Sequence, residues 1–297
     1  MIEPLPDLLI HPVVRGALAE DLGRAGDVTA QACIPADAQL ACTFGARQDG
    51  VISGLACARL ALAELDPSAR FEARASDGQR VSAGAVLAEV RGNARAILSA
   101  ERTALNLLGR LSGVATLTRA YVDAVSGTRA RITDTRKTTP GLRQLEKYAV
   151  RCGGGRNHRM SLSDAAMVKD NHVVAAGGVV AAFEAVRAAF PDVPIEVEAD
   201  TVEDAVLAVE AGADLVLLDN MSPADLRRAV KLVAGRAKLE ASGGLTLGTA
   251  RKTASTGVDY LAIGALTHSV QVLDIGLDLR PMDEPRGAAV DADGSGV

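Results

Sequence analysis

The second half of the chain alternates short apolar runs, typical of buried strands, with segments that have the apolar period of helices. Six runs have the strand pattern: Ile132-Thr133, Ala166-Met167-Val168, Ile195-Glu196-Val197, Leu215-Val216-Leu217-Leu218, Leu239-Glu240-Ala241 and Leu261-Ala262-Ile263. The later runs recur roughly every twenty residues, which leaves room for one helix between successive parallel strands. Six units are fewer than the eight of a complete barrel. The pattern therefore predicts an incomplete, open-faced (βα) barrel of about six parallel strands, with a doubly wound sheet as the alternative.

The N-terminal part of the chain lacks this alternation and predicts a smaller unit that ends near residue 100. We expect one helix to begin at His11-Pro12 and stop at Gly23, and a second at about 55–65. Expected strands are Cys42 to Arg47, Val51-Ile52 after an Asp49-Gly50 hairpin turn, and short runs around Phe71, Val81, Val86-Leu87 and Ala96-Ile97-Leu98. Ser99 can cap the next helix, which Gly113 is expected to interrupt.

Basic residues concentrate in three segments, 134–140, 153–159 and 169–172, of a chain whose net charge is −5. Their cationic residues are joined by others nearby: Arg136, Lys137, Arg143, Lys147, Arg151, Arg156, Arg159 and Lys169, with His158 and His172. A solvated basic surface is one interpretation. However, Arg136-Lys137 directly follows a strand, and the cations stand among Gly and Thr residues. This placement favours a pocket for a multiply charged anion.

Residues capable of chemistry follow each predicted strand at its C-terminal end. They are Asp134-Thr135-Arg136-Lys137, Lys169-Asp170, Glu198, Asp219-Asn220, Ser242-Gly243-Gly244 and Gly264-Ala265. Barrel active sites form at this rim, because the loops there vary while the strands hold them rigidly. The Ser242-Gly243-Gly244 and Gly264-Ala265 loops suit a phosphate, since bare backbone N–H groups can approach it.

Two carboxylates on neighbouring predicted strands, Glu198 and Asp219, could hold Mg²⁺ through water beside a diphosphate. The alternative is that they neutralise Lys137 or Lys169. We find no Ser-His-Asp order, no HExxH and no cysteine beside a base, so covalent catalysis is not indicated.

Composition limits the partners of this chain. The acidic balance and the absence of Trp argue against nucleic acid, because the basic cluster is local and base-stacking side chains are few. Four cysteines without CxxC spacing are typical of reduced core residues, and no segment has the length of a membrane span. The N-terminus has no basic, apolar leader. We expect a soluble, cytoplasmic protein.

The motifs resemble the quinolinate phosphoribosyltransferase family. The specific runs are Thr133 to Gly141 (TDTRKTTPG), Gly154 to Arg159 (GGRNHR), Lys169 to His172 (KDNH), Glu196 to Glu198 (EVE) and Leu239 to Gly244 (LEASGG). Asp21 to Thr29, Ala46 to Gly50 and Ser99 to Asn106 are similar to the family too. The resemblance extends from about residue 10 to 280, and we expect residues 281–297, which lie beyond it, to form a disordered tail.

The resemblance implies an N-terminal α/β sandwich, residues 1–101 joined by segment 270–280, and a barrel domain over residues 102–269. It implies that quinolinate and phosphoribosyl diphosphate with Mg²⁺ give nicotinate mononucleotide, diphosphate and CO₂. It also implies a homodimer, with a hexamer of dimers as the alternative, and Arg102 reaching into the partner's site.

The resemblance also assigns roles to site residues. Lys137, Glu198 and Asp219 are the expected catalytic residues, and the two carboxylates would contact Mg²⁺ indirectly. The expected substrate-binding residues are these three together with Arg102, Thr135, Arg136, His158, Arg159, Lys169, Ser242, Gly243, Gly244, Ile263, Gly264, Ala265 and His268.

Two other functions remain open. A barrel lyase could use Lys137 or Lys169 as a Schiff-base nucleophile, which requires a desolvated lysine with a lowered pKa. A protein of the same fold could also bind a related anion without catalysing a reaction, or act on a different substrate.

Overall fold

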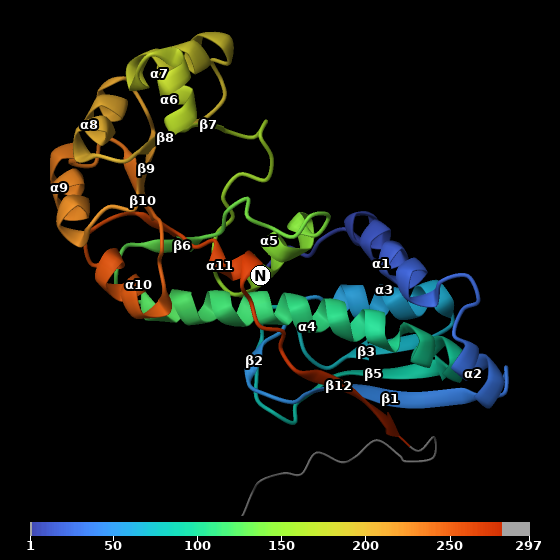
Figure 1. Cartoon of the computed structure of the whole chain (residues 1–297). Coiled ribbons are helices and arrows are strands. Elements are labelled where there is room, and N and C mark those ends of the chain that lie inside the picture. Colours follow the sequence, from blue (N-terminus) through green and yellow to red (C-terminus); the bar gives the residue numbers. More distant parts are fainter. Residues whose placement is uncertain (1, 281–297) are drawn as a thin grey trace, which may run out of the picture.

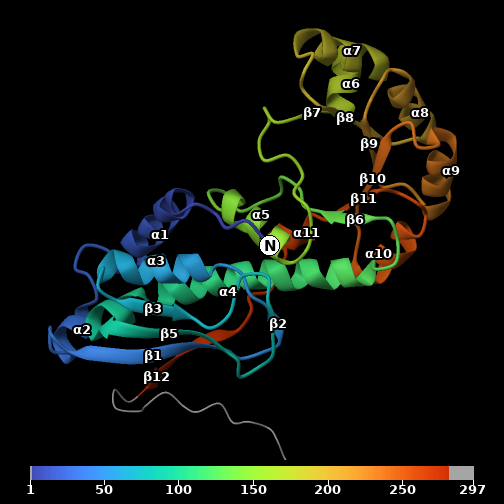
Figure 2. The same cartoon turned by 180° about the vertical axis from the view of Figure 1, so that it is seen from behind.

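The computed structural model describes residues 2–280, so the predicted tail at 281–297 lies outside the described residues. Figure 1 shows an open barrel beside a smaller N-terminal part, with one long helix running through both. Figure 2 gives the view from behind, in which the barrel strands again line the inner side of an arc of helices.

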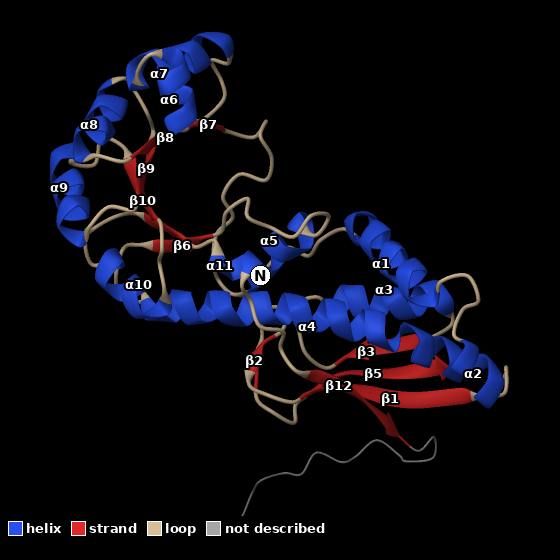
Figure 3. Cartoon of the chain, in the orientation of Figure 1, coloured by secondary structure: helices blue, strands red, loops and turns tan. Residues whose placement is uncertain are grey.

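Six parallel strands form the barrel, as the sequence predicts. Their order is β6-β11-β10-β9-β8-β7, and their bounds are β6 (Arg131–Thr133), β7 (Ala166–Val168), β8 (Ile195–Ala199), β9 (Leu215–Asp219), β10 (Lys238–Ser242) and β11 (Tyr260–Ala262). Strands β7 to β11 follow one another in chain order and β6 pairs with β11, whereas a doubly wound sheet would reverse direction in its middle. Figure 3 shows the helices outside this curved sheet.

The helices of the barrel are α5 (Arg143–Cys152), α6 (Asp170–Ala176), α7 (Val179–Ala189), α8 (Val202–Glu210), α9 (Pro223–Val233), α10 (Leu247–Ala254) and α11 (Ala265–His268). Two of them, α8 and α9, start at residues that favour helix N-termini. The side chains of Thr201 and Ser222 accept backbone N–H bonds at the starts of α8 and α9. These two residues are therefore structural caps.

The barrel is open between β6 and β7, its two edge strands. One isolated parallel bridge, Thr133 with Arg156, adds a short piece of backbone beside β6. The Arg156 N–H donates to Ile132 O, and the Asp134 N–H donates to Arg156 O. The segment that follows α5 therefore extends the sheet into the gap.

The N-terminal part is an antiparallel sheet with helices. Four strands pair in the order β12-β1-β5-β3, namely β12 (Ile275–Arg280), β1 (Gln39–Ala46), β5 (Val86–Asn93) and β3 (Arg70–Ala73), while β2 (Gly50–Val51) pairs with β4 (Arg80–Val81). The helices are α1 (Asp7–Leu22), α2 (Val28–Cys33) and α3 (Leu55–Leu65). Strand β12 returns from the end of the barrel to the edge of this sheet.

Three local predictions for this part are wrong. Helix α1 begins at Asp7 and contains Pro12, because the chain turns helical one turn earlier than the Pro12 signal indicates. Asp49-Gly50 makes no hairpin, since β2 pairs with β4 rather than with β1. Cys33 is exposed, whereas the other three cysteines are buried.

Helix α4 (Ala94–Ala124) is continuous, which corrects three further predictions. The run Ala96-Ile97-Leu98 is helical and not a strand, and the N-cap is Asn93, whose side chain accepts from the Ala96 N–H at 3.2 Å. Gly113 does not interrupt the helix. A Cβ atom there would collide with the backbone oxygen of Gln271, so this glycine lets the returning chain pack closely against α4. Because α4 crosses residue 101, the domain limits stay a prediction.

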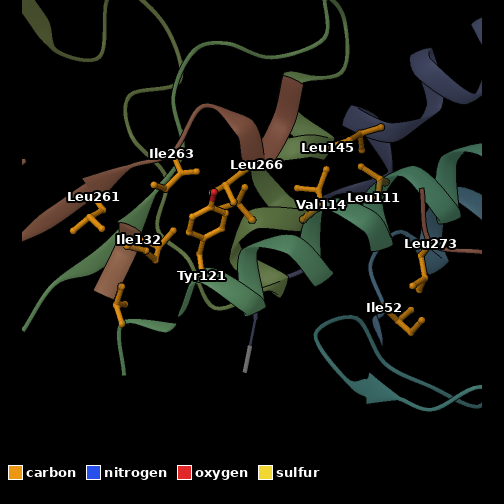
Figure 4. Close-up of a cluster of buried hydrophobic side chains, with 14 of the residues drawn as sticks. Ile52, Leu111, Val114, Tyr121, Ile132, Leu145, Leu261, Ile263, Leu266 and Leu273 are labelled. Atoms are coloured by element: carbon orange, nitrogen blue, oxygen red, sulfur yellow. The ribbon is translucent and has the colours of Figure 1, made fainter. Parts of the chain in front are cut away.

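The core follows α4 from one part to the other, as Figure 4 shows for labelled side chains. Leu111, Val114 and Tyr121 on α4 are nearly fully buried, and Ile132 and Leu261 pack from the barrel strands. Each such aliphatic side chain contributes about 1.5–3 kcal/mol when fully buried. In the part of the chain described, no single helix is long and apolar enough to cross a membrane; α6 and α7, which meet at 89°, reach that length and composition only together.

Candidate active site

A cavity of about 380 Å³ lies at the C-terminal ends of the barrel strands. Its lining contains nine of the predicted site residues: Thr135, Arg136, Lys137, His158, Arg159, Lys169, Glu198, Asp219 and Ser242. They come from segments far apart in the chain, which the parallel strands bring to one rim. The structure thus brings these nine residues to one cavity, while their individual roles stay predictions.

The cavity holds unbalanced positive charge. Burial lowers the pKa of Arg159, and the neighbouring charge of Arg136 lowers it further. Arg159 Nη1 donates to Ala165 O at 2.7 Å, which leaves the rest of its guanidinium available. The Nε atom of Arg136 is buried and has no partner among residues 2–280. Two guanidinium groups held close together at a cavity favour an anion between them.

The acidic side chains of the cavity lie beside this basic group. Glu198 Oε2 is 2.8 Å from Lys169 Nζ, so the pairing that the sequence leaves as an alternative does occur. Asp219 accepts a hydrogen bond from the Asn220 side chain at 2.6 Å. Carboxylate oxygens of Glu198, Asp219 and the exposed Asp200 lie within 4.8 Å of one another. Hard oxygen donors at this spacing fit Mg²⁺, and Asp200 is an addition to the predicted set.

One residue of the basic cluster, Lys147, has a structural role together with the acidic Asp134. Lys147 Nζ lies 2.6 Å from Asp134 Oδ1, and both side chains are fully buried. Lys147 also donates to the backbone oxygens of His158 and Arg159, and Asp134 accepts from the His158 N–H and the Asn157 side chain. Burial raises the pKa of Asp134 and lowers that of Lys147, but these contacts satisfy the charged forms of both. The pair fixes the loop that carries His158 and Arg159.

The glycine loops lie at the rim, but only Ser242 belongs to the cavity lining within the described chain. Gly243 has φ +92°, and a Cβ there would collide with the Asn220 side chain. A Cβ on Gly264 would lie 3.2 Å from Lys137 Cδ and 3.0 Å from His268 Nε2, so these three residues are neighbours. The predicted phosphate contacts of Gly243, Gly244, Gly264, Ala265 and His268 stay predictions.

Two predicted residues lie away from the cavity. Ile263 is 1% exposed, and its side chain packs in the core. Arg102 is exposed on α4 and, in the described part of the chain, is not among the residues lining the cavity. His172, by contrast, accepts the Lys169 N–H at 3.0 Å and so caps α6.

Four residues line the cavity that the sequence does not single out as site residues: Met167, Leu217, Glu240 and Ala262. Glu240 is 1% exposed inside the barrel. Burial and the Glu196 carboxylate raise the pKa of Glu240 to about 8. The sequence does indicate that Glu240 points into the barrel. It stands between the apolar residues Leu239 and Ala241 of a predicted barrel strand, and side chains along such a strand alternate between the interior and the helices.

Comparison with known proteins decides the family. Residues 27–112 match the N-terminal domain, and residues 114–278 the C-terminal domain, of quinolinate phosphoribosyl transferase. The chain belongs to the quinolinate phosphoribosyl transferase family. Nicotinate-nucleotide pyrophosphorylase (carboxylating) of Mycobacterium leprae is 52% identical over 90% of this chain and 95% of that protein. The chloroplastic enzyme of that name from Arabidopsis thaliana is 43% identical over 92% and 84%.

Solved structures agree with this membership. The nicotinate-nucleotide pyrophosphorylase of Francisella tularensis superposes with a TM-score of 0.89 at 36% identity, covering 94% of this chain and 99% of that one. The NadC protein of Streptococcus pyogenes gives a TM-score of 0.90 at 38% identity, covering 94% and 100%. The family fold, an open barrel with a smaller N-terminal part, is therefore the fold of this chain.

Proposed function

We propose that this protein transfers the phosphoribosyl group of phosphoribosyl diphosphate to quinolinate with loss of CO₂. The products are nicotinate mononucleotide and diphosphate, which places the reaction in NAD biosynthesis. The curated relatives carry the names of this activity. The observation that supports it most is the cavity in which Arg136, Arg159 and Lys169 meet the carboxylates of Glu198 and Asp219.

Quinolinate carries two adjacent carboxylates, and the cavity offers matching donors. Arg136 and Arg159 can each bind a carboxylate in the two-pronged geometry of a guanidinium group. Lys169 and Lys137 add point charges. The charge of Arg136 lowers the pKa of Arg159, so the two guanidinium groups repel each other. A dianion bound between them would remove this repulsion.

The bond changes need positioning rather than a protein nucleophile. The pyridine nitrogen attacks the sugar carbon as the bond from that carbon to the diphosphate oxygen breaks. Glu198 and Asp219 stabilise the positive charge that develops at the sugar carbon. The alkylated nitrogen then stabilises the electron pair left on the ring carbon when CO₂ departs.

Mg²⁺ is the cofactor that we propose for this reaction. Glu198, Asp219 and Asp200 offer oxygen ligands at a suitable spacing. Bound with the diphosphate, the ion would neutralise charge on the leaving group. Lys169 Nζ lies 2.8 Å from Glu198 Oε2 and so competes with the ion for this carboxylate. This is consistent with a contact between Glu198 and Mg²⁺ that passes through water.

We further propose a homodimer, with a hexamer of dimers as the alternative assembly, and with Arg102 donated across the interface. The position of Arg102 supports this, since the side chain is exposed on α4 and, in the described part of the chain, does not line the cavity. We also propose that the protein works in the cytoplasm and binds neither nucleic acid nor membrane.

The test is direct. Purified protein with quinolinate, phosphoribosyl diphosphate and Mg²⁺ should form nicotinate mononucleotide and release diphosphate and CO₂ in equal amounts. Omission of either substrate should abolish all three products. A protein that binds quinolinate by calorimetry but forms no mononucleotide would instead be a non-catalytic binder.

The Schiff-base alternative is weakened by the Lys169–Glu198 contact. An ion pair needs the protonated ammonium, whereas a Schiff-base lysine needs the free amine. Borohydride reduction in the presence of substrate should therefore leave the protein without a covalent adduct. A trapped adduct on Lys137 or Lys169 would favour the lyase.

A further inference from the structure

Three titratable side chains meet inside the barrel, beneath the substrate cavity. Glu240 comes from β10, Glu196 from β8 and His158 from the loop that spans the gap. One ligand atom of each lies within 4.8 Å of the others. Glu240 and Glu196 are 1% and 3% exposed, so neither charge is solvated by bulk water. The reaction steps above use neither glutamate.

Polar atoms of this group are left without partners. His158 Nε2 lies 2.7 Å from Glu196 Oε2, but without the alignment of a hydrogen bond. Glu196 Oε1 has no partner within the described residues. The Arg159 N–H donates to His158 Nδ1 at 2.8 Å, which places the imidazole proton on Nε2, toward Glu196. An unpaired buried atom costs free energy, so the retention of Glu196 Oε1 without a partner indicates a use.

The hydroxyl of Thr133 indicates which form Glu240 takes. It lies 3.1 Å from Glu240 Oε1 and 3.2 Å from Leu261 O, yet it has only one proton to donate. A protonated Glu240 satisfies both contacts, because it donates to Thr133 while Thr133 donates to Leu261. Rotation of the same carboxyl group about its side-chain bond would direct its proton into the cavity that Glu240 lines.

A second cavity reaches the same group from the other side. It has about 330 Å³ and is lined by residues at the N-terminal ends of the strands, among them Ile195, Leu215 and Tyr260. Glu240 and His158 line both cavities. Glu240 therefore lies between the substrate cavity and a separate opening at the opposite end of the barrel.

The proposed reaction needs a proton at this place. When CO₂ leaves, the bond from the ring carbon to the carboxylate breaks and its electron pair stays on the carbon, which must take up a proton. We propose that the carboxylic acid of Glu240 donates this proton. The new C–H bond forms as the Glu240 O–H bond breaks, and a solvent proton restores the acid through His158 and the second cavity, which both His158 and Glu240 line.

The charges around Glu240 are consistent with this role. Glu196, His158 and Asp134 face it from the neighbouring elements, while Arg159, Lys137 and Lys169 share its cavity. Burial and the Glu196 carboxylate raise the pKa of Glu240 to about 8, so the acid form prevails at neutral pH. Leu217 and Ala262 are apolar residues that line the same cavity. An acid with a pKa near the working pH is the effective kind of proton donor.

The inference rests on the proposed function, and the experiment separates the two. Diphosphate release and CO₂ release are followed together in a single turnover with carboxyl-labelled quinolinate. Release of diphosphate by the unmodified protein tests the proposed function. In Glu240→Gln, diphosphate release should stay within about threefold, whereas CO₂ release should slow at least tenfold, the lower range for loss of a general acid. Glu240→Asp, which keeps an acid, should recover part of the rate.

Two outcomes would overturn the inference. One is a Glu240→Gln variant in which CO₂ release keeps pace with diphosphate release, which would assign the proton to Lys137 or Lys169. The other is measured in the unmodified protein and so applies even where the variant fails to fold. It is a ratio of CO₂ release to diphosphate release that stays constant between pH 7 and 9.5. We expect that ratio to fall above about pH 8, as Glu240 ionises.

Discussion

Lys147 Nζ and Asp134 Oδ1 lie 2.6 Å apart in the interior of the protein, where neither side chain reaches solvent. Lys147→Met leaves the Asp134 carboxylate buried without its counter-charge, which costs about 3–5 kcal/mol of unfolding free energy. Urea unfolding measures this loss. The control is the double variant Asp134→Asn with Lys147→Met, in which both charges are absent and the loss should be smaller. Equal losses in the single and double variants would show that the charge pairing is not the cause.

Arg136→Ala and Arg159→Ala should each weaken quinolinate binding by about 2–5 kcal/mol, because a buried carboxylate loses its partner. Calorimetric titration with quinolinate measures the effect, and the thermal midpoint should change little. Arg131→Ala is the matched control, since Arg131 is exposed and begins β6 at the end opposite to Arg136. Normal affinity in either cavity variant would remove that residue from the binding site.

Arg102→Ala should abolish turnover without unfolding the chain, and so should Lys137→Ala. Mixing the two variants under conditions of subunit exchange should restore part of the turnover, because one site of each mixed dimer has both residues intact. The measurement is mononucleotide formation before and after mixing. If proven exchange brings no recovery, Arg102 does not act across an interface.

Glu198→Gln separates charge stabilisation from simple pairing with Lys169. Loss of one preorganised electrostatic group should lower kcat roughly 10²–10³-fold, with quinolinate affinity nearly unchanged. The measurements are kcat at saturating substrates and Mg²⁺, the thermal midpoint and the quinolinate Kd. Glu203→Gln is the control, because Glu203 is exposed and pairs with Arg228 at the surface. A lowered midpoint with near-normal kcat would make Glu198 a structural residue.

The pH dependence of stability reports on Glu240 independently of catalysis. Its pKa is raised from 4.5 to about 8 on folding, so the folded state binds more protons than the unfolded state between these values. The contribution of Glu240 to stability is therefore present below pH 4.5 and lost as the pH rises to about 8, by at most about 1.4 kcal/mol per pH unit. Urea unfolding from pH 5 to 8 should show this decline, and Glu240→Gln should flatten it. An identical slope in both proteins would contradict the raised pKa.

The six barrel strands are predictable because each is a short apolar run with a polar residue at its C-terminal end. Their parallel order brings Arg136, Glu198 and Asp219 to one rim without further information. Glycine predicts the ends of helices less reliably than apolar runs predict strands. Gly113 serves the close approach of Gln271 to α4, a contact between distant segments that no local pattern encodes.

The same limit applies to the site. Lys147 and Arg136 look alike in the sequence, and only the fold shows that Lys147 is buried against Asp134. Glu240 stands in a strand like any other buried residue, and its importance comes from Glu196 and His158, which other elements bring beside it. Charges that act together inside a fold are set by tertiary contacts rather than by spacing along the chain.

The open side of the barrel has a consequence for its ligand. Arg136 follows the end of β6 and Lys169 follows the end of β7, so they stand on the two edge strands of the six-stranded sheet. In the proposed complex, a dicarboxylate bound by both residues links these two strands across the gap that two further strands fill in a complete barrel. Bound substrate should then stabilise the open barrel as well as react in it. Amide exchange in β6 and β7 should slow more on binding than exchange in β9, which has strands on both sides already.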